Sequence, residues 1–246
     1  MKLFLAVAIL LFAANSTAQT YSELCTEAEK YIQEQQYEYA AEYFRKAYSA
    51  SSNDTEKIYA LANQAHAQQL CCNYEAALET NNKALGISSG NSVLLLQRAD
   101  IYLALNRVTE ALDDCNTILE LDALNCDAIY CRALIHTQAG EYNKAMDDYK
   151  SLLTLESEKS RAKTGIVMLY QKERKYNEAL MLVGLFIEEE PDNAEFYVAR
   201  SNVEKELWQY ELAIMDIEKA IALQPDNANY YTIRAILIEM SGKTEY

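Results

Sequence analysis

The side chains in this sequence that could bind a metal or carry redox chemistry are six cysteines and two histidines. Cys71 and Cys72 are adjacent, and no C-x-x-C motif is present. His66 lies five residues before Cys71, which is a poor spacing for two ligands on one helix. The cysteines and histidines therefore predict no metal site and no thioredoxin-like redox centre.

Other patterns of catalytic residues are also missing from the sequence. It contains no Ser/His/Asp set that suggests a nucleophile with its base, and no glycine-rich loop that could hold a phosphate. We therefore expect a protein that is not an enzyme, uses no cofactor and has no evident small-molecule substrate. The formal net charge of −15 argues against a nucleic-acid partner, because so acidic a chain would repel a phosphate backbone.

The composition indicates which type of secondary structure carries these side chains. Apolar residues make up 50% of the chain and charged residues 24%, which is typical of a folded, soluble protein. Only 6 Gly and 2 Pro interrupt the 246 residues, far fewer than turn-rich β architectures need. The composition therefore predicts an all-α protein.

One pattern of residues returns six times along the chain. An aromatic or apolar residue is followed by an alanine three residues later, and by further, mostly apolar residues seven and ten later. The copies begin at Tyr37, Tyr74, Val108, Tyr142, Tyr176 and Tyr210, which are 37, 34, 34, 34 and 34 residues apart. Such a period indicates a repeat architecture.

Each copy has a second segment upstream, with a small residue about nine positions before the aromatic one in most copies. Spacings of three and four in both segments predict two amphipathic helices per repeat. The second helices are predicted to start at the six residues given above. The first helices are predicted at Tyr21–Gln33, Ile58–Leu70, Ser92–Leu105, Cys126–Gln138, Ser160–Lys172, Ala194–Glu206 and Ala228–Met240.

Turn residues separate these segments. The three extra residues between the first two copies fall in a polar stretch, Ser51–Thr55, which is predicted to be a loop. Gly140 and Gly242 fall between paired helices, where a left-handed residue ends the first one. Pro191 and Pro225 close the fifth and sixth copies at the same point of the period.

The repeated pattern resembles the tetratricopeptide repeat (TPR) family, whose unit is a helix-turn-helix of 34 residues. The resemblance covers residues 21–246 and implies an α-α superhelix, a right-handed solenoid of antiparallel helix pairs. We expect one repeat domain, residues 19–246, with six full repeats starting near residues 21, 58, 92, 126, 160 and 194. Residues 228–240 would form a C-terminal capping helix.

An arginine and an aspartate recur together in three of the complete copies. Arginines occupy one position of the first helices, and aspartates occupy one position of the second helices. The predicted structural ion pairs within repeats are Arg98–Asp114, Arg132–Asp148 and Arg200–Asp216.

The cysteines leave two interpretations open. An even count in an exported protein permits disulfides, whereas the repeat explains Cys115 as a small apolar core residue. If one bridge forms, it would join Cys115 to Cys126 or Cys131, because that second helix should pack on the next first helix.

In the TPR family the inner face of the solenoid, made from first helices, usually binds a peptide or a partner segment. Carried over to this chain, the resemblance implies a partner-binding groove and a protein-binding scaffold or adaptor. The residues of this groove would be Tyr59, His66, Leu96, Asp100, Tyr130, Leu134, Arg161, Met168 and Lys172. The alternative interpretation is that these residues are ordinary exposed or packing residues of a solenoid.

The N-terminus predicts export. Lys2 precedes an apolar run over residues 3–14, and small residues at Ser16 and Ala18 suit cleavage before Gln19. Residues 1–18 are therefore predicted to be a signal peptide, and the mature chain to be periplasmic or secreted. The alternative is a membrane-tethered assembly factor or sensor that retains this segment as an anchor, which would be its only contact with a membrane.

Overall fold

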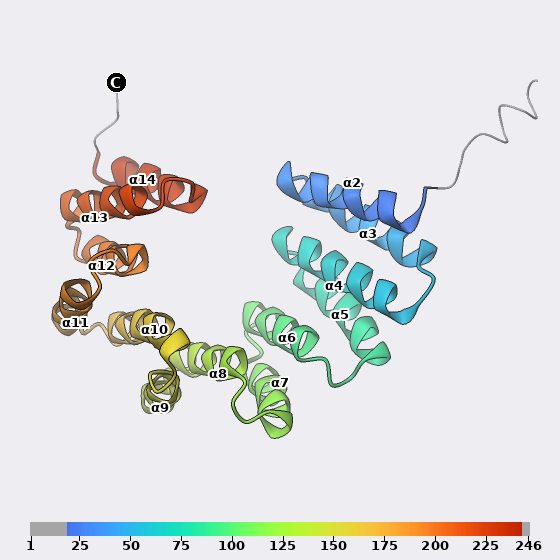
Figure 1. Cartoon of the computed structure of the whole chain (residues 1–246), viewed down its shortest axis with the longest axis horizontal. Helices are drawn as coiled ribbons and strands as arrows, with labels where there is room; N and C mark the ends of the chain where they lie inside the picture. Colours follow the sequence, from blue (N-terminus) through green and yellow to red (C-terminus); the bar gives the residue numbers. More distant parts are fainter. Residues whose placement is uncertain (1–18, 243–246) are drawn as a thin grey trace, which may run out of the picture. The chain divides into compact units, whose positions relative to one another are not determined.

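The computed structural model describes residues 19–242, and the predicted signal peptide, residues 1–18, lies outside this range. Within residues 19–242 the chain forms thirteen α-helices, one short 3-10 helix and no strand. The all-α prediction is therefore confirmed. Figure 1 shows the helices following one another in chain order.

The helices alternate between first and second members of six pairs, and a single helix follows. The first helices are α2 (Tyr21–Gln33), α4 (Asp54–Leu70), α6 (Ser92–Ala104), α8 (Cys126–Gln138), α10 (Lys159–Lys172) and α12 (Ala194–Glu206), with α14 (Ala228–Met240) as the final one. The second helices are α3 (Tyr37–Ala50), α5 (Tyr74–Ile87), α7 (Val108–Leu121), α9 (Tyr142–Leu152), α11 (Tyr176–Glu189) and α13 (Tyr210–Leu223). All six second helices begin at the predicted residue.

The first helices show one clear error in the predicted boundaries. Helix α4 begins at Asp54 rather than at residue 58, so the loop predicted up to Thr55 ends at Asn53. The Asn53 side chain accepts a hydrogen bond from the Glu56 backbone N–H at 2.9 Å, which caps the helix. The extra residues of this copy therefore mainly lengthen α4. Smaller differences are that α6 ends one residue early and that a 3-10 turn, Glu156–Glu158, leads into α10.

The chain divides into two compact units, which we describe separately. In unit 1, residues 19–114 of the described chain, α2 to α5 pack each on the next, and α4 also contacts α6. In unit 2, residues 115–242, α8 to α14 pack each on the next, and α10 also contacts α8 and α12. Within each unit these helices thus bury their apolar faces against their neighbours in sequence, as in other repeat proteins.

Residues at two fixed positions form the centre of each repeat: an alanine on every second helix, and on the first helices an alanine in four copies, with Val167 and Ser201 in the last two. The small residues predicted on the first helices are completely or almost completely buried, and so is the alanine three residues into each second helix. In the four copies with alanine at both positions, only methyl groups lie between the two backbones, which can therefore approach closely. The fully buried second-helix alanines are Ala40, Ala77, Ala111, Ala145, Ala179 and Ala213.

At a second core position the side chain differs in size from repeat to repeat. Where it is large, a small residue of the next first helix lies against it. Tyr149 of α9 is fully buried and lies against Gly165 of α10, where an added Cβ would be 2.3 Å from the Tyr149 ring. Phe44, at the same position of the first copy, packs with Ala60 of the next first helix. The size of each core residue is therefore matched locally, between consecutive repeats.

The turn between paired helices has a left-handed residue in every copy. Gly140 and Gly242 have φ values of +76° and +72°, which confirms the prediction for both glycines. The other copies use residues with side chains at the same step, with φ between +57° and +62°: Gln35, Cys72, Asn106, Arg174 and Trp208. The repeat therefore requires a left-handed residue at this turn, whether or not that residue is glycine.

We expect the substitution Gly165→Ala to lower the free energy of unfolding by about 1–3 kcal/mol, because the new methyl group must displace the buried Tyr149 ring. Urea denaturation followed by circular dichroism measures this change. The matched control is Gly184→Ala in α11, where an added Cβ meets no atom within 4 Å. There the better helix propensity of alanine should stabilise the protein by about 0.5–1 kcal/mol. Equal effects of the two substitutions would contradict the Tyr149–Gly165 contact.

Candidate partner-binding site

The three predicted ion pairs form within their repeats. Each arginine donates two hydrogen bonds, from Nε and Nη2, to both oxygens of one aspartate. The Nε and Nη2 distances are 2.8 and 2.6 Å for Arg98–Asp114, 3.0 and 2.7 Å for Arg132–Asp148, and 2.6 and 2.7 Å for Arg200–Asp216. All three aspartates are buried. Two parallel bonds to a buried carboxylate orient the paired helices more strictly than an exposed ion pair would.

Two of these arginines also reach back to the preceding repeat, which the sequence analysis missed. Arg98 Nη1 donates to Asn82 Oδ1 at 2.8 Å, and Arg132 Nη1 donates to Asn116 Oδ1 at 3.2 Å. The signal was an asparagine 16 residues before the arginine, just as the aspartate is 16 residues after it. Arg200 has Gly184 at the corresponding position and therefore lacks this bond.

Glu204 of α12 lies beside the third pair. Its Oε1 atom is 4.0 Å from Arg200 Nε, and its Oε2 atom is buried without a hydrogen-bond partner. Burial and the nearby Asp216 carboxylate raise the pKa of Glu204 to about 7, although Arg200 opposes the shift. The other complete copies carry tyrosine, glutamine or histidine at this position, so a buried carboxyl group here is peculiar to the sixth repeat.

Within residues 19–242 none of the six cysteines forms a disulfide, so the bridge considered for Cys115, Cys126 and Cys131 is not present. Cys115 is fully buried as the small core residue of its copy, and Cys131 is also buried. The Cys126 thiol donates instead to the Leu124 carbonyl at 3.4 Å. The apolar interpretation of these cysteines is the one that the structure supports.

The two histidines lie in different surroundings. His136 is buried, and its Nδ1 atom lies 2.6 Å from Glu141 Oε2. His66 is exposed on α4. Among residues 19–242 no group of three or more His, Cys, Asp or Glu side chains is placed to hold a metal ion.

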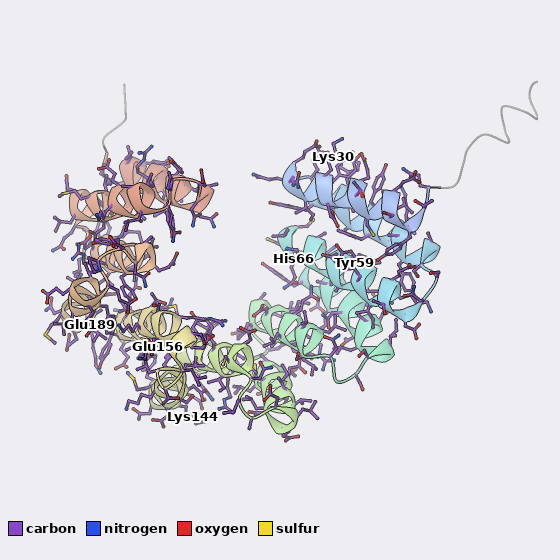
Figure 2. The ribbon with its side chains drawn as sticks, in the orientation of Figure 1. Lys30, Tyr59, His66, Lys144, Glu156 and Glu189 are labelled. Carbon is purple, nitrogen blue, oxygen red and sulfur yellow. The ribbon has the colours of Figure 1, made fainter. Side chains whose placement is uncertain are left out.

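Four of the predicted groove residues belong to unit 1. Tyr59 and His66 lie along α4 (Figure 2), and Leu96 and Asp100 lie on α6. Tyr59 is 44% exposed, and its hydroxyl donates to Glu29 Oε1 at 2.8 Å. His66 and Asp100 are exposed, whereas Leu96 is half-buried. Three of these four side chains are thus exposed on the first helices of unit 1.

The other five predicted groove residues belong to unit 2, where a pocket of about 170 Å³ lies across three consecutive first helices. Tyr130 of α8 and Met168 of α10 line it. Leu134 is half-buried and Lys172 exposed, and neither lines the pocket. The pocket also contains residues that the predicted groove omitted: Thr164, Val167, Gln171, Glu195, Val198, Ala199 and Asn202.

The repeat could have revealed several of the omitted residues. Glu195, Val198 and Asn202 follow Arg161, Thr164 and Met168 by 34 residues. The predicted groove stopped at the fifth repeat, although the sixth continues the same face of first helices. We call the surface formed by α8, α10 and α12 around this pocket the first-helix face.

Tyr130 lines the pocket and is also contacted by Arg161, a predicted groove residue that does not itself line the pocket. The Arg161 guanidinium lies over the Tyr130 ring, with its central carbon 4.0 Å from the ring centroid. Arg161 Nη1 also donates to Asp127 Oδ1 at 2.7 Å. The Tyr130 ring packs in a T-shaped arrangement on Tyr149, at a centroid distance of 5.8 Å. Burial raises the pKa of Tyr130, so its hydroxyl stays protonated and can donate a hydrogen bond near neutral pH.

Comparison with known proteins identifies relatives of this architecture. A family model described as "Tetratricopeptide repeat" matches residues 194–227. A tetratricopeptide repeat protein from Parabacteroides merdae is 25% identical, with 91% of this chain and 87% of that chain covered and a TM-score of 0.62. The pilF protein of Pseudomonas aeruginosa is 20% identical, with 88% and 97% covered and a TM-score of 0.56. The TPR protein TTC0263 of Thermus thermophilus is 16% identical, with 89% and 100% covered and a TM-score of 0.55. No curated protein matches this sequence.

Helix pairs that stack on their neighbours at a fixed period define the class of α-helical repeat proteins, and the α-α superhelix is the fold of the solved relatives. The repeat pattern and the family match to the sixth copy make the resemblance more specific. The chain is similar to tetratricopeptide repeat proteins, in sequence over residues 194–227 and in fold over most of its length.

The raised pKa of Glu204 predicts a pH-dependent stability. Between its ordinary value of 4.5 and about 7, folded Glu204 holds a proton that the unfolded chain releases. The free energy of unfolding should therefore fall as the pH rises through this window, by about 2–3 kcal/mol from this group. Urea denaturation of the wild type and of Glu204→Gln at about pH 5 and about pH 8 measures the difference. The variant should lose this part of the pH dependence. If the free energies of unfolding of the two proteins changed in parallel with pH, Glu204 would not be a buried carboxyl group with a raised pKa.

Proposed function

We propose that this protein is a non-enzymatic scaffold or adaptor that binds a peptide segment of a partner protein on the first-helix face of unit 2. The observation that carries the proposal is the pocket across α8, α10 and α12, which has apolar side chains from all three helices and polar groups around them. Apolar pockets with a few polar groups are typical binding sites. Similarity to the TPR family supports a protein or peptide as the partner.

The pocket residues suit an extended peptide with one apolar side chain. Met168, Val198 and Ala199 offer an apolar surface for that side chain, and the buried Val167 lies beneath it. Gln171 and Asn202 carry amide groups, which can both donate to and accept from a peptide backbone. Gln171 Nε2 already donates to the backbone carbonyl of Asn202 at 3.2 Å, which holds the Gln171 amide at the pocket.

An enzymatic function is the alternative from another class. The sequence has no set of nucleophile, base and charge-stabilising groups that a mechanism would require. TPR proteins are generally scaffolds, which favours binding as the function of this chain.

We also propose that the protein acts outside the cytoplasm, in the periplasm or extracellular space. The support is the sequence of residues 1–18, a basic start, an apolar run and small residues before Gln19. Among residues 19–242, no helix has the length and apolar content needed to cross a bilayer. The alternative role as a tethered assembly factor requires residues 1–18 to remain attached.

The peptide-binding proposal predicts that acidic side chains in the pocket abolish binding. Peptides selected from a displayed random library against residues 19–246 should bind the wild type and lose at least about tenfold in affinity to Met168→Asp and to Val198→Asp, because each change places a charge where an apolar side chain packs. Fluorescence anisotropy measures the affinities. In a pull-down from source cells, a Tyr130→Ala/Leu134→Ala variant should likewise lose partners.

Lys150→Glu is the control for the peptide experiment. Lys150 is exposed on α9, a second helix, and does not line the pocket. This variant should bind the selected peptides like the wild type. Peptides that bind Met168→Asp and Val198→Asp with undiminished affinity would refute the proposed site, provided that circular dichroism shows both variants folded.

Export predicts a particular N-terminus for the mature protein. Intact-mass spectrometry of the protein from its source cells should find a chain that begins at Gln19, because Ser16 and Ala18 fit the cleavage rule. Replacing Ala18 with an arginine should leave the precursor uncut. A wild-type protein that keeps residues 1–18 in the membrane fraction would instead support the tethered alternative.

A further inference from the structure

One outward position of the second helices changes character in the last two repeats. In the first four copies it is occupied by acidic residues, and in the fifth and sixth by methionine. In chain order, the residues at this position are Glu42, Glu79, Asp113, Asp147, Met181 and Met215. Carboxylates are typical of a solvated helix face. The two methionines therefore break the pattern that the first four repeats follow at this position.

Both methionines are strongly exposed, and two leucines accompany them. Met181 of α11 and Met215 of α13 are 67% and 64% exposed, while Leu185 and Leu212 are 50% and 48% exposed. Met181 and Leu185 are four residues apart on one helix, and Leu212 and Met215 are three apart on the other. Each pair therefore forms one stripe on its helix. We call these four side chains the outer Met/Leu patch.

The patch is not part of the core of its unit. Helices α11 and α13 both pack against α12, and their buried positions include Val183 and Ile217. Leu185 stands where the other copies have polar residues, which are Lys46, Lys83, Thr117, Ser151 and Lys219. Apolar side chains have thus replaced polar ones on a face that the structure of residues 19–242 leaves uncovered.

The charges around the patch are nearly all negative. Helices α11 and α13 contain one basic residue, Lys219, whereas four exposed glutamates flank the apolar stripes. These glutamates are Glu178, Glu188, Glu211 and Glu218. An apolar surface with an acidic border complements a segment that has an apolar stripe with basic flanks.

We propose that the outer Met/Leu patch is a second docking surface, which binds an amphipathic helix of a partner with lysine or arginine beside its apolar stripe. Methionine side chains are flexible and polarisable, so they adapt to differently shaped apolar partners. Recognition of an apolar helix face with basic flanks follows the same physical rules as other helix-binding surfaces. This surface lies on second helices and does not share residues with the pocket on the first-helix face.

The charge of the chain makes two other occupants unfavourable. A second copy would bring another acidic border against the first, in a chain of net charge −15. An anionic lipid surface would be repelled for the same reason. The patch therefore fits a basic partner better than either of these.

The test uses a synthetic 14-residue helical peptide of leucine and lysine with all leucines on one face, labelled with fluorescein. The protein is residues 19–246, as wild type and as the double variant M181E/M215E, which restores the acidic rule of the first four repeats. We expect the variant to bind the peptide at least about tenfold more weakly in about 0.15 M salt. Non-specific attraction of a basic peptide to an acidic protein predicts the opposite sign, because the variant is more acidic. Equal or tighter binding by the variant would therefore overturn the proposal.

A control variant separates the added charge from the position. T55E/N143E adds the same two charges at exposed residues of α4 and α9, away from the patch. It should bind the peptide at least as tightly as the wild type. Trp208, the single tryptophan, lies four residues before Leu212, so its emission should shift to the blue when the peptide covers the patch. This shift should be absent in M181E/M215E.

Light scattering tests the alternative occupant. The wild type should remain monomeric at the concentrations used. A wild-type dimer that M181E/M215E converts to a monomer would assign the patch to a second copy of this chain and refute the basic-partner proposal. Neither result depends on peptide binding at the first-helix face, so the two binding proposals can fail separately.

Discussion

The close approach of two helix backbones through buried alanines is the contact on which the whole structure depends. Because Ala133 and Ala145 occupy almost no space, the larger side chains around them reach the next repeat instead of filling their own. Tyr149 extends in this way to Gly165, and Phe44 packs with Ala60. The repeat therefore has a contact within each pair that changes little, since its second-helix residue is always alanine, and a contact between pairs whose side chains vary in size.

The period of the sequence predicted those parts of the fold that depend on local pattern. All six second-helix starts and the ion pairs of Arg98, Arg132 and Arg200 came from residues at fixed spacing. The start of α4 was missed because one asparagine side chain, that of Asn53, decides it. The pocket was predicted only in part, since Tyr130 and Met168 were expected while the residues from the sixth repeat were not. The arrangement of units and the pairing state of cysteines depend on contacts that no spacing encodes.

The two helix layers of unit 2 carry different chemistry. The first helices place amide, aromatic and apolar groups around a small pocket, and Arg161 stacks on Tyr130, one of the residues that line it. At one outward position the second helices of unit 2 carry the acidic Asp147 on α9 but the exposed apolar residues Met181 and Met215 on α11 and α13. A scaffold with two such faces can hold two partners whose sequences need share nothing, one as an extended segment and one as a helix.

The asparagine that joins Arg98 and Arg132 to the preceding repeat bears on how such an array can grow. Asn82 and Asn116 occupy the same position in the second and third copies. Each of these two copies therefore offers the arginine of the next copy the same hydrogen-bond acceptor. If the third repeat were duplicated, the arginine of the new copy could donate to Asn116 of the original. The asparagine of the new copy could in turn accept from Arg132 of the fourth repeat. The fifth copy offers Gly184 instead, so a duplicate placed after it inherits no such bond. A duplication of the third repeat would therefore keep this hydrogen bond between consecutive copies, whereas a duplication of the fifth would not.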